Sequence, residues 1–517
     1  MMRSRLLAIT GLVSFALATS ALAVAQSSDT LSPKGTALSA TKTQIKSTGT
    51  KPTHHQSPPP PGAVRPTGTV TIPASSNKTA KGFAHTNIEI FVPKGQPSIA
   101  IPGPAVPVSQ FVETPASLGC VYNVGPQYAG CNPATGRTNH PTGGWGAIAL
   151  VDAFDNPSAG PDLVFFSKSM GLAPIILDPF AGANFHKISA DTRWGDPLGL
   201  GWTASCSTGV GYPPPDPGWG LEEDLDIEYA HAMAPSATIL LVEACSNSYQ
   251  DLFFAEIVAQ ILIEDYYPGG DISNSWSGGE DPAQLGDWSL LPASGWDNVF
   301  YRFAPPNTTF FASAGDFGWG AGYPSTNPWV ISAGGTSVWR DRIGNYLAQG
   351  CWGNLYGASG GGPSAVEIYQ DTDIEEGPGP WTNYQYQLFG GTPGFTPARD
   401  TPDIAFDADP LSGVYVYDGG LWYIVGGTSV SSPSLAGIVN NANNRFSQFN
   451  LTFPEFYTPE ELNYIYSQQD AYTTFPANWS EVTFGDNGAC SFGICPGIGV
   501  AYNECTGLGF PLGKLGK

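Results

Sequence analysis

The chain has 517 residues, of which 41% are hydrophobic, and its formal net charge is −23 at pH 7. Residues 1–114 hold ten Lys/Arg and three Asp/Glu, whereas residues 115–517 hold eleven Lys/Arg and 41 Asp/Glu. Phosphate binding needs a basic surface, so the acidic body argues against a nucleic-acid partner. A carboxylate-rich body with few lysines suits work in acid, where protonation lowers self-repulsion, although the same composition could serve solubility alone.

The first residues have the three parts of a secretory signal peptide, which we expect over residues 1–25. Arg3 and Arg5 supply the positive start, an apolar run follows, and small residues offer a cleavage site. The apolar run is shorter than a bilayer span needs, and no later stretch is long and apolar enough to cross a membrane. We therefore expect a soluble protein that is secreted to the extracellular space or the periplasm.

Two segments of different composition follow. Residues 26–114 are rich in Ser, Thr, Pro and Lys, and we expect a leader or short pro-segment in which only 87–93 and 98–111 are extended pieces. From about residue 115 the composition is globular. Residues 115–517 can bury a large core as one domain.

Eight cysteines fit an exported protein, because an even count in an oxidising compartment favours disulfides. Cys120 and Cys131 could close a small loop, and Cys490 and Cys495 could close another, but the connectivity cannot be deduced. The sequence contains no Cys-x-x-Cys motif, which argues against a zinc site.

Strands and helices are expected to alternate in the body. The expected strands cover 145–154, 237–244, 271–277 and 308–316. The expected helices cover 161–172, 221–234, 249–267 and a run from Ser429 to about Arg445. This alternation predicts an α/β fold with a parallel sheet that is covered by helices on both faces.

The pentapeptide Gly-Gly-Thr-Ser-Val occurs twice, at 334–338 and at 426–430. Around Ser337 the sequence is typical of a strand, a turn and a second strand, so we expect a structural role. After Ser429, Pro433 and small residues are typical of a first helical turn. A serine there would gain backbone N–H groups and the positive end of the helix dipole, but it could also be an ordinary helix cap.

A catalytic serine needs a base. The histidines lack the sequence context of a subtilisin-type base, although His231 remains formally possible. Glu222 and Asp226 lie four residues apart on an expected helix, so they project from one face and could share a proton. A solvated acidic helix end is the competing interpretation, and spacing alone favours it.

Longer motifs give a specific resemblance. The segments "GGTSVSSPSLAG", "EEDLDIEYAHAMAPSATILLVEA" and "FFASAGDFG" resemble the sedolisin family of serine-carboxyl peptidases. Further matches, including "SGGGPSAVEIYQ" and "NECTGLGFPLGKL", follow in the family's order from about residue 113 to the C-terminus. The resemblance implies a subtilisin-like fold.

The same resemblance implies a role for each matching residue. Ser429 matches the nucleophile, Glu222 the general base, and Asp226 the acid that orients the base. Asp316 matches the aspartate whose protonated carboxyl binds the oxyanion, a role that calls for low pH or a raised pKa. Asp152 lies at a strand end where relatives carry a supporting acid, although it could equally cap a turn.

Two features depart from the family pattern. Residues 26–114 are short and Pro-rich for the large folded pro-domain that the family carries, although they could still occupy the cleft in extended form. The residues that correspond to the family's calcium site are Glu481, Val482 and Asn503, where a neutral amide replaces one carboxylate. We therefore expect a weakened or absent calcium site, and no cofactor for the chemistry.

The sequence as a whole predicts a secreted, monomeric, acid-active endopeptidase that cuts protein or peptide substrates through an acyl-enzyme on Ser429. One alternative is a secreted binding or surface protein that keeps the fold without catalysis. A third is a subtilisin-type enzyme that uses His231.

Overall fold

The structure is a computed structural model. It describes residues 59–197, 202–206, 213–285, 295–301, 308–368, 385, 398–448, 458–467, 479–488 and 502–513. The expected signal peptide and the first part of the leader lie outside these residues.

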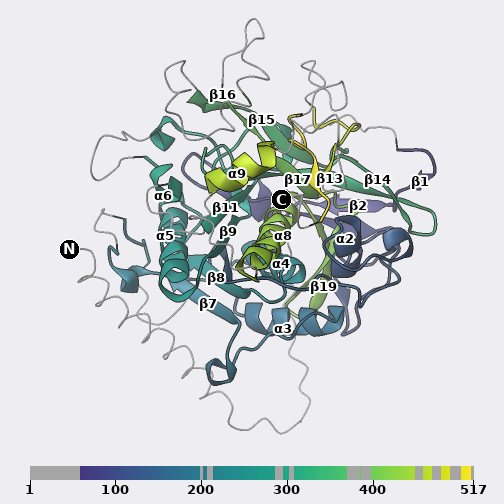
Figure 1. The fold of residues 1–517 in the computed structure, drawn as a ribbon, viewed down its shortest axis with the longest axis horizontal. Coiled ribbons are helices and arrows are strands. Elements are labelled where there is room, and N and C mark those ends of the chain that lie inside the picture. The colour runs from purple at the N-terminus through teal and green to yellow at the C-terminus, as the bar shows by residue number, and fades with distance from the viewer. Residues whose placement is uncertain are drawn as a thin grey trace, which may run out of the picture.

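A sheet of nine strands, counted over the described residues, forms the centre of the molecule (Figure 1). Its order is β1 (Ala63–Val64), β13 (Ile331–Asp341), β11 (Thr308–Ser313), β9 (Gly270–Asn274), β6 (Ala147–Ala153), β8 (Thr238–Ala244) and β7 (Phe185–Ala190), and β14 (Tyr346–Cys351) and β17 (Ile404–Asp407) also pair with β13. The pairings from β7 to β13 and from β13 to β17 are parallel, whereas β1 and β14 run antiparallel. The expected parallel sheet is confirmed.

Helices cover both faces of this sheet. The α-helices are α2 (Pro115–Val121), α3 (Ala159–Met170), α4 (Pro217–Met233), α5 (Tyr249–Tyr266), α6 (Asn298–Tyr301), α8 (Thr428–Gln448) and α9 (Thr458–Ser467). The 3-10 turns are η1 (Ala74–Ser76), η2 (Ala129–Cys131), η3 (Pro179–Ala181), η4 (Thr192–Trp194) and η5 (Pro282–Gln284). Helices α4 and α8 pack together on one face, and α5 packs against β6, β7 and β8.

The two faces of β6 divide the hydrophobic core. Ile148 and Leu150 belong to the cluster under α4 and α8, whereas Ala149 and Val151 belong to the cluster under α5. Every residue of β6 is buried. A parallel strand that is buried on both faces reads as a continuous apolar run, which is why the sequence identified this one.

Smaller sheets surround the central one. A five-stranded sheet contains β18 (Val414–Asp418), β19 (Leu421–Gly426), β4 (Glu89–Pro93), β2 (Gly68–Thr71) and β5 (Ile101–Pro102). The remaining strands are β3 (His85–Thr86) with β10 (Trp276–Ser277), β12 (Phe317–Trp319) with β15 (Ala358–Ile368) and β16 (Ala398–Thr401), and β20 (Trp479–Ser480) with β21 (Phe510–Pro511).

The described part of the expected leader, 59–114, is built into this fold. Its strand β4 pairs with β19, the strand that leads to Ser429, and its strand β1 pairs with β13. At its end the buried Glu113 accepts two hydrogen bonds of 2.6 Å from the buried Arg340. These residues therefore contribute strands and a buried ion pair to the globular body.

The first pentapeptide copy lies in the middle of β13, so the expected turn at this copy is wrong. The chain turns later, between β13 and β14, where Gly344 has φ +92°. The hydroxyl of Ser337 is buried and donates to Asp409 Oδ2 at 2.6 Å. The expected structural role of Ser337 agrees with this contact.

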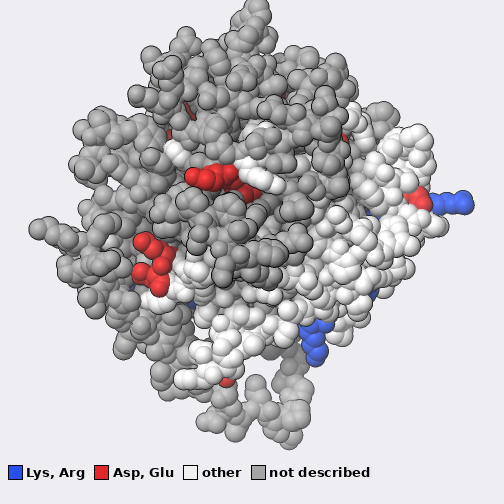
Figure 2. Space-filling view, viewed as in Figure 1, with Lys and Arg blue, Asp and Glu red and all other residues white. Residues whose placement is uncertain are grey.

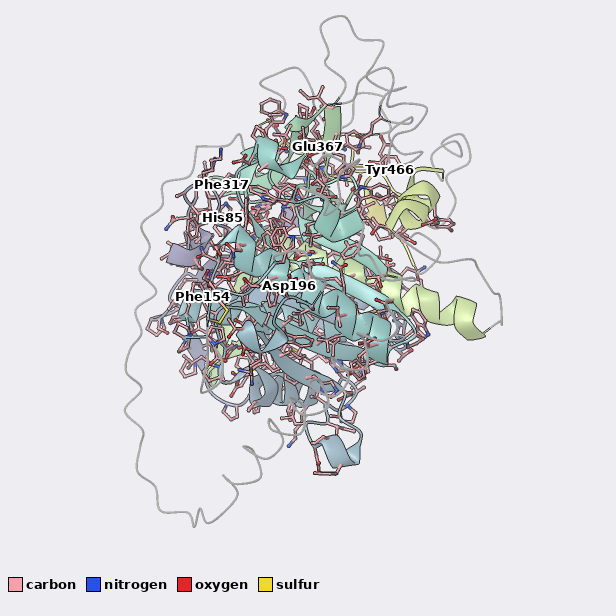
Figure 3. The ribbon with its side chains drawn as sticks, turned by 90° about the vertical axis from the view of Figure 1, so that its left-hand side faces the viewer. His85, Phe154, Asp196, Phe317, Glu367 and Tyr466 are labelled. Carbon is pink, nitrogen blue, oxygen red and sulfur yellow. A yellow bond between two sulfur atoms is a disulfide. The ribbon has the colours of Figure 1, made fainter. Side chains whose placement is uncertain are left out.

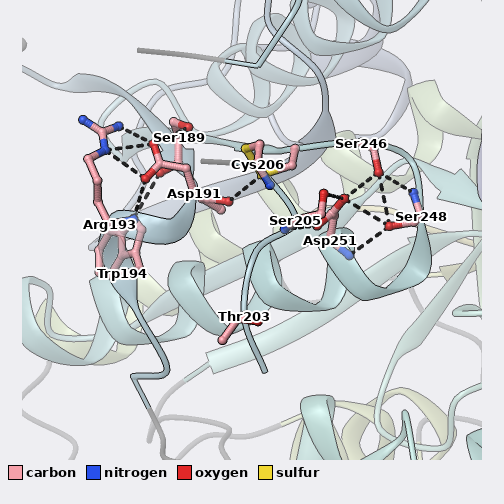
Figure 4. Close-up of a disulfide and its surroundings, with 12 residues drawn as sticks. Ser189, Asp191, Arg193, Trp194, Thr203, Ser205, Cys206, Ser246, Ser248 and Asp251 are labelled. Carbon is pink, nitrogen blue, oxygen red and sulfur yellow. Dashed lines mark hydrogen bonds and ion pairs between the residues drawn. A yellow bond between two sulfur atoms is a disulfide. The ribbon is translucent and has the colours of Figure 1, made fainter. Parts of the chain in front are cut away.

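Disulfides join distant segments of the fold. The described pairs are Cys120–Cys131, Cys206–Cys245 and Cys351–Cys505. The first was one of the expected loops and is confirmed, whereas Cys490 and Cys495 lie outside the described residues. Beside Cys206, the hydroxyl and amide of Ser205 donate to Asp251 near the start of α5 (Figure 4). The second disulfide thus ties residues 202–206 to the residue after β8, and the Ser205 bonds hold them against α5.

Charged side chains are scattered on the described part of the face in Figure 2, which is mostly uncharged. Many acids of the body are instead buried, among them five on α4: Glu222, Glu223, Asp224, Asp226 and Glu228. No helix in the described part of the chain combines the length and apolarity that a membrane span requires.

Candidate active site

Ser429 is the second residue of α8. Strand β19 ends at Gly426, and Gly427 has φ +116°, a conformation that glycine adopts without strain. Its Cβ, if it had one, would lie 2.6 Å from Asp316 Oδ2. This tight turn delivers the buried Ser429 to the N-terminus of α8, where backbone N–H groups and the helix dipole favour negative charge.

Glu222 and Asp226 lie on the helix that packs against α8. Helix α4 begins after Asp216, whose carboxylate accepts from the amides of Gly218 and Trp219. Glu222 and Asp226 are both fully buried, so the interpretation of these acids as a solvated helix end is wrong.

Burial raises the pKa of Glu222 well above its ordinary value, and the charges of Asp152 and Asp316 raise it further. The polar hydroxyl of Ser429 lies near enough to oppose this rise in the pKa of Glu222, while the hydrogen bond that it donates goes to the Ser275 carbonyl oxygen. Burial also raises the pKa of Asp226, with Asp152 and Glu222 adding to the effect. The structure therefore brings Ser429, Glu222 and Asp226 together, and the acids hold protons more tightly than free carboxyls do.

Asp152 completes this acidic cluster from the sheet. It lies near the carboxyl end of β6, is fully buried, and has no hydrogen-bond partner for either carboxylate oxygen among the described residues. Burial raises the pKa of Asp152 to about 8. An acid that carries no hydrogen bond is not capping a turn, so its contribution is electrostatic, through Glu222 and Asp226.

Asp316 approaches Ser429 from the sheet, directly after β11. Its Oδ1 accepts from the Thr428 amide at 2.8 Å and from the Thr428 hydroxyl at 2.9 Å. The Gly315 amide donates to the same hydroxyl at 3.0 Å. These bonds hold the buried Asp316 carboxyl beside the first turn of α8.

His231 lies away from this cluster. It is nine residues beyond Glu222 on α4, which places it on the opposite side of the helix. Its Nε2 lies 3.0 Å from the Ala173 carbonyl oxygen, and burial lowers its pKa to about 4. The histidine-based alternative is therefore not supported by the geometry.

The residues of the expected calcium site do not form a cage of oxygen ligands. Asn503 Oδ1 already accepts from the Cys505 amide, the Thr506 amide and the Thr506 hydroxyl at 2.9–3.1 Å. The side chain of Glu481 is exposed and that of Val482 is buried and apolar. Calcium prefers six to eight oxygen ligands, and this arrangement does not fit that requirement.

Two residues at the site were not identified from the sequence. The Ser429 hydroxyl donates to the Ser275 carbonyl at 3.1 Å, and the Ser429 amide donates to the Asn87 carbonyl at 3.3 Å. Ser275 follows the carboxyl end of β9, where parallel sheets commonly place functional groups, and this position could have indicated it. Asn87 lies in the expected leader, and no motif around it indicated a role at the site.

No protein-family model matches the chain. Its sequence is 27% identical over 303 residues to kumamolisin of Bacillus sp. (strain MN-32), covering 56% of this chain and 49% of kumamolisin. It is 28% identical over 243 residues to sedolisin of Pseudomonas sp. (strain 101), covering 42% and 34%, and 26% identical over 305 residues to tripeptidyl-peptidase 1 of Dictyostelium discoideum, covering 56% and 46%. The matches thus span half or less of the length of these relatives.

The fold comparison agrees with these sequence matches. The structure of Pseudomonas sedolisin, a serine-carboxyl proteinase in complex with pseudo-iodotyrostatin, superposes with a TM-score of 0.52 at 19% identity. The match covers 78% of this chain and 96% of that structure. The expected subtilisin-like fold is confirmed. In sequence and in fold, the chain is a relative of the sedolisin family of serine-carboxyl peptidases.

Proposed function

We propose that the chain is a secreted, acid-active serine-carboxyl endopeptidase that cuts protein or peptide substrates. The observation that carries the proposal is the placement of Ser429 at the start of α8 beside the fully buried Glu222 of α4, whose pKa burial raises. Peptidase relatives over about half of the chain support the reaction class.

In the proposed reaction Ser429 Oγ attacks the carbonyl carbon of the scissile bond while Glu222 takes its proton. Asp226 acts as a positioning residue, since it lies one turn further along α4 and the charge of Glu222 raises its pKa. The developing oxyanion would be met by the Ser429 amide and by the Asp316 carboxyl, which donates only while it is protonated.

We expect activity in acid because the proposed reaction needs carboxyls of this cluster to keep their protons. The charge of Asp152 raises the pKa of Glu222, and the charges of Asp152 and Glu222 raise the pKa of Asp226, so the cluster resists carrying more than one negative charge. As the pH rises, added charges in the cluster repel one another, and the proposed role of Asp316 requires a protonated carboxyl. We therefore expect activity between about pH 3 and 5 and a decline toward neutral pH.

The test is digestion of an unstructured protein such as casein across that pH range. Ser429→Ala and Glu222→Gln should each lower kcat/KM at least about 100-fold. The matched control is Glu228→Gln, which neutralises a buried carboxylate on the same helix that faces the Tyr417 amide instead. Undiminished activity in both site variants would refute the assignment. No cleavage and no labelling by a serine-directed probe would favour the non-catalytic binding protein.

A further inference from the structure

Residues 84–89 of the expected leader run through the candidate active site. The Ala84 amide donates to the Asn247 carbonyl at 2.8 Å, and the Asn247 side chain donates back to the Ala84 carbonyl at 2.7 Å. His85 and Thr86 then pair antiparallel with Trp276 and Ser277 of β10. An extended segment that adds itself to an exposed strand edge is a standard mode of peptide recognition.

The backbone of Asn87 reaches the reacting groups. Its carbonyl oxygen accepts from the Ser429 amide at 3.3 Å and lies where a Cβ on Gly427 would be only 1.9 Å away. Asp316 Oδ2 would lie 2.6 Å from the same Cβ on Gly427, so it borders this position too. The Asn87 carbonyl therefore occupies the place that the oxyanion donors of the proposed reaction would serve.

The side chain of Asn87 fills a polar subsite of its own. Its Nδ2 donates to Ser313 Oγ at 2.7 Å, and its Oδ1 accepts from Ser277 Oγ at 3.1 Å. Asn87, Ser277 and Ser313 are all buried. An apolar side chain at this position would leave two buried hydroxyls without these partners, which is costly. A buried subsite that satisfies an amide in this way discriminates strongly against analogues without the amide.

The side chain of His85, two residues before Asn87, also lies in a subsite. His85 lies against the edge of the Phe317 ring, with ring centroids 5.3 Å apart, and the two side chains lie close together in Figure 3. Both line a cavity of about 230 Å³ that extends between Lys78 and Trp319. The segment thus presents alternate side chains, those of His85 and Asn87, to separate subsites, as a bound extended peptide does.

We infer that residues 85–88 are a built-in substrate, that Ser429 cuts the Asn87–Ile88 bond, and that the enzyme prefers asparagine on the acyl side of the bonds it cleaves. The inference rests on the proposed function. Ser429 Oγ forms a bond to the Asn87 carbonyl carbon, its proton passes through Glu222 to the Ile88 nitrogen, and the C–N bond breaks. Water then hydrolyses the ester, leaving an Asn87 carboxyl group and an Ile88 amine.

The fold holds both products after the cut. Ile88 is buried, and the strand that follows it, β4, stays paired with β19 and β2. On the other side, β3 stays paired with β10, and Arg65 stays paired with Asp409 and stacked 3.8 Å above Trp339. The uncut segment blocks the site, and because these contacts hold the cut segment in place, peptide substrates gain access only once it also dissociates from β10.

The test begins with the full chain, purified at neutral pH and shifted to about pH 4. Intact mass and N-terminal sequencing should show a new N-terminus at Ile88 in the wild type and none in Ser429→Ala. Asn87→Leu should slow this cleavage at least about tenfold. Thermal unfolding of Asn87→Leu in the Ser429→Ala background shows whether the variant is folded.

A second measurement does not depend on the folding of that variant. The processed enzyme is given a peptide with the sequence of residues 84–89 and the same peptide with leucine in place of the asparagine. We expect kcat/KM to be at least about tenfold higher for the asparagine peptide. Equal values, or processing at another bond while casein is digested, would overturn this inference and leave the proposed function standing. Loss of both casein digestion and processing would refute the proposed function and this inference together.

Discussion

Glu256 offers a direct measure of how buried acids tie this fold to low pH. It lies on α5, on the opposite face of the sheet from Ser429, and its side chain is fully buried. Burial raises the pKa of Glu256 from 4.5 to about 8, and the polar side chains of Asn274 and Gln260 oppose part of this rise. Because no charged neighbour contributes to this shift, Glu256→Gln isolates the cost of burying one carboxylate.

The direction of the pH effect on stability depends on whether the folded or the unfolded chain loses the Glu256 proton first. Below about pH 4.5 both the folded and the unfolded chain are protonated at Glu256, and folding costs nothing extra. As the pH rises toward 8, the unfolded chain ionises while the folded chain keeps its proton, so stability falls by about 1.4 kcal/mol per pH unit. The loss reaches about 3 kcal/mol at pH 7, and glutamine does not incur it.

The assay is guanidinium unfolding of Glu256→Gln at pH 4 and pH 7 in the Ser429→Ala background, which prevents self-digestion. The variant should match its parent at pH 4 and exceed its free energy of unfolding by about 3 kcal/mol at pH 7. Asp178→Asn is the matched control, because Asp178 is exposed and the amide keeps the oxygen that caps η3. A gain that is equal at both pH values, or a loss at pH 7, would refute the reasoning.

The other predictions concern single contacts, each measured by chemical unfolding of the inactive protein. Arg340→Met should cost about 3–5 kcal/mol, because it leaves the buried Glu113 unpaired, and a change below 1 kcal/mol would contradict the buried ion pair. Replacing Cys351 and Cys505 by serine should cost up to about 5 kcal/mol, since their disulfide spans 154 residues. Ser337→Ala should cost about 1–3 kcal/mol and, tested in the active protein, should leave peptidase activity intact, in contrast to Ser429→Ala.

Much of the fold could be predicted because its strands are buried on both faces. The short run of apolar residues in β6 indicates a buried strand. The longer apolar segments of α3 and α5 exceed the usual length of a strand and therefore indicate helices. The first pentapeptide copy misled because glycines at 334 and 335 are typical of a turn. Both glycines lie in β13 instead, where a Cβ on Gly334 would lie 2.4 Å from Pro402 Cγ and one on Gly335 would lie 2.8 Å from the Ala408 Cβ. Only the three-dimensional packing shows that these two strand positions require glycine.

The candidate site shows the same division between local pattern and long-range contact. Ser429, Glu222 and Asp226 could be identified because motifs of neighbouring residues carry them, whereas Asn87 is 342 residues from Ser429 and has no motif. Its position depends on β3 and β4, and each finds its partner strand elsewhere, in β10 and β19. A Ser/Thr/Pro-rich composition indicates only that a segment builds little core of its own. It says nothing about a segment that completes another core, and here that segment supplies the Asn87 carbonyl that accepts from the Ser429 amide.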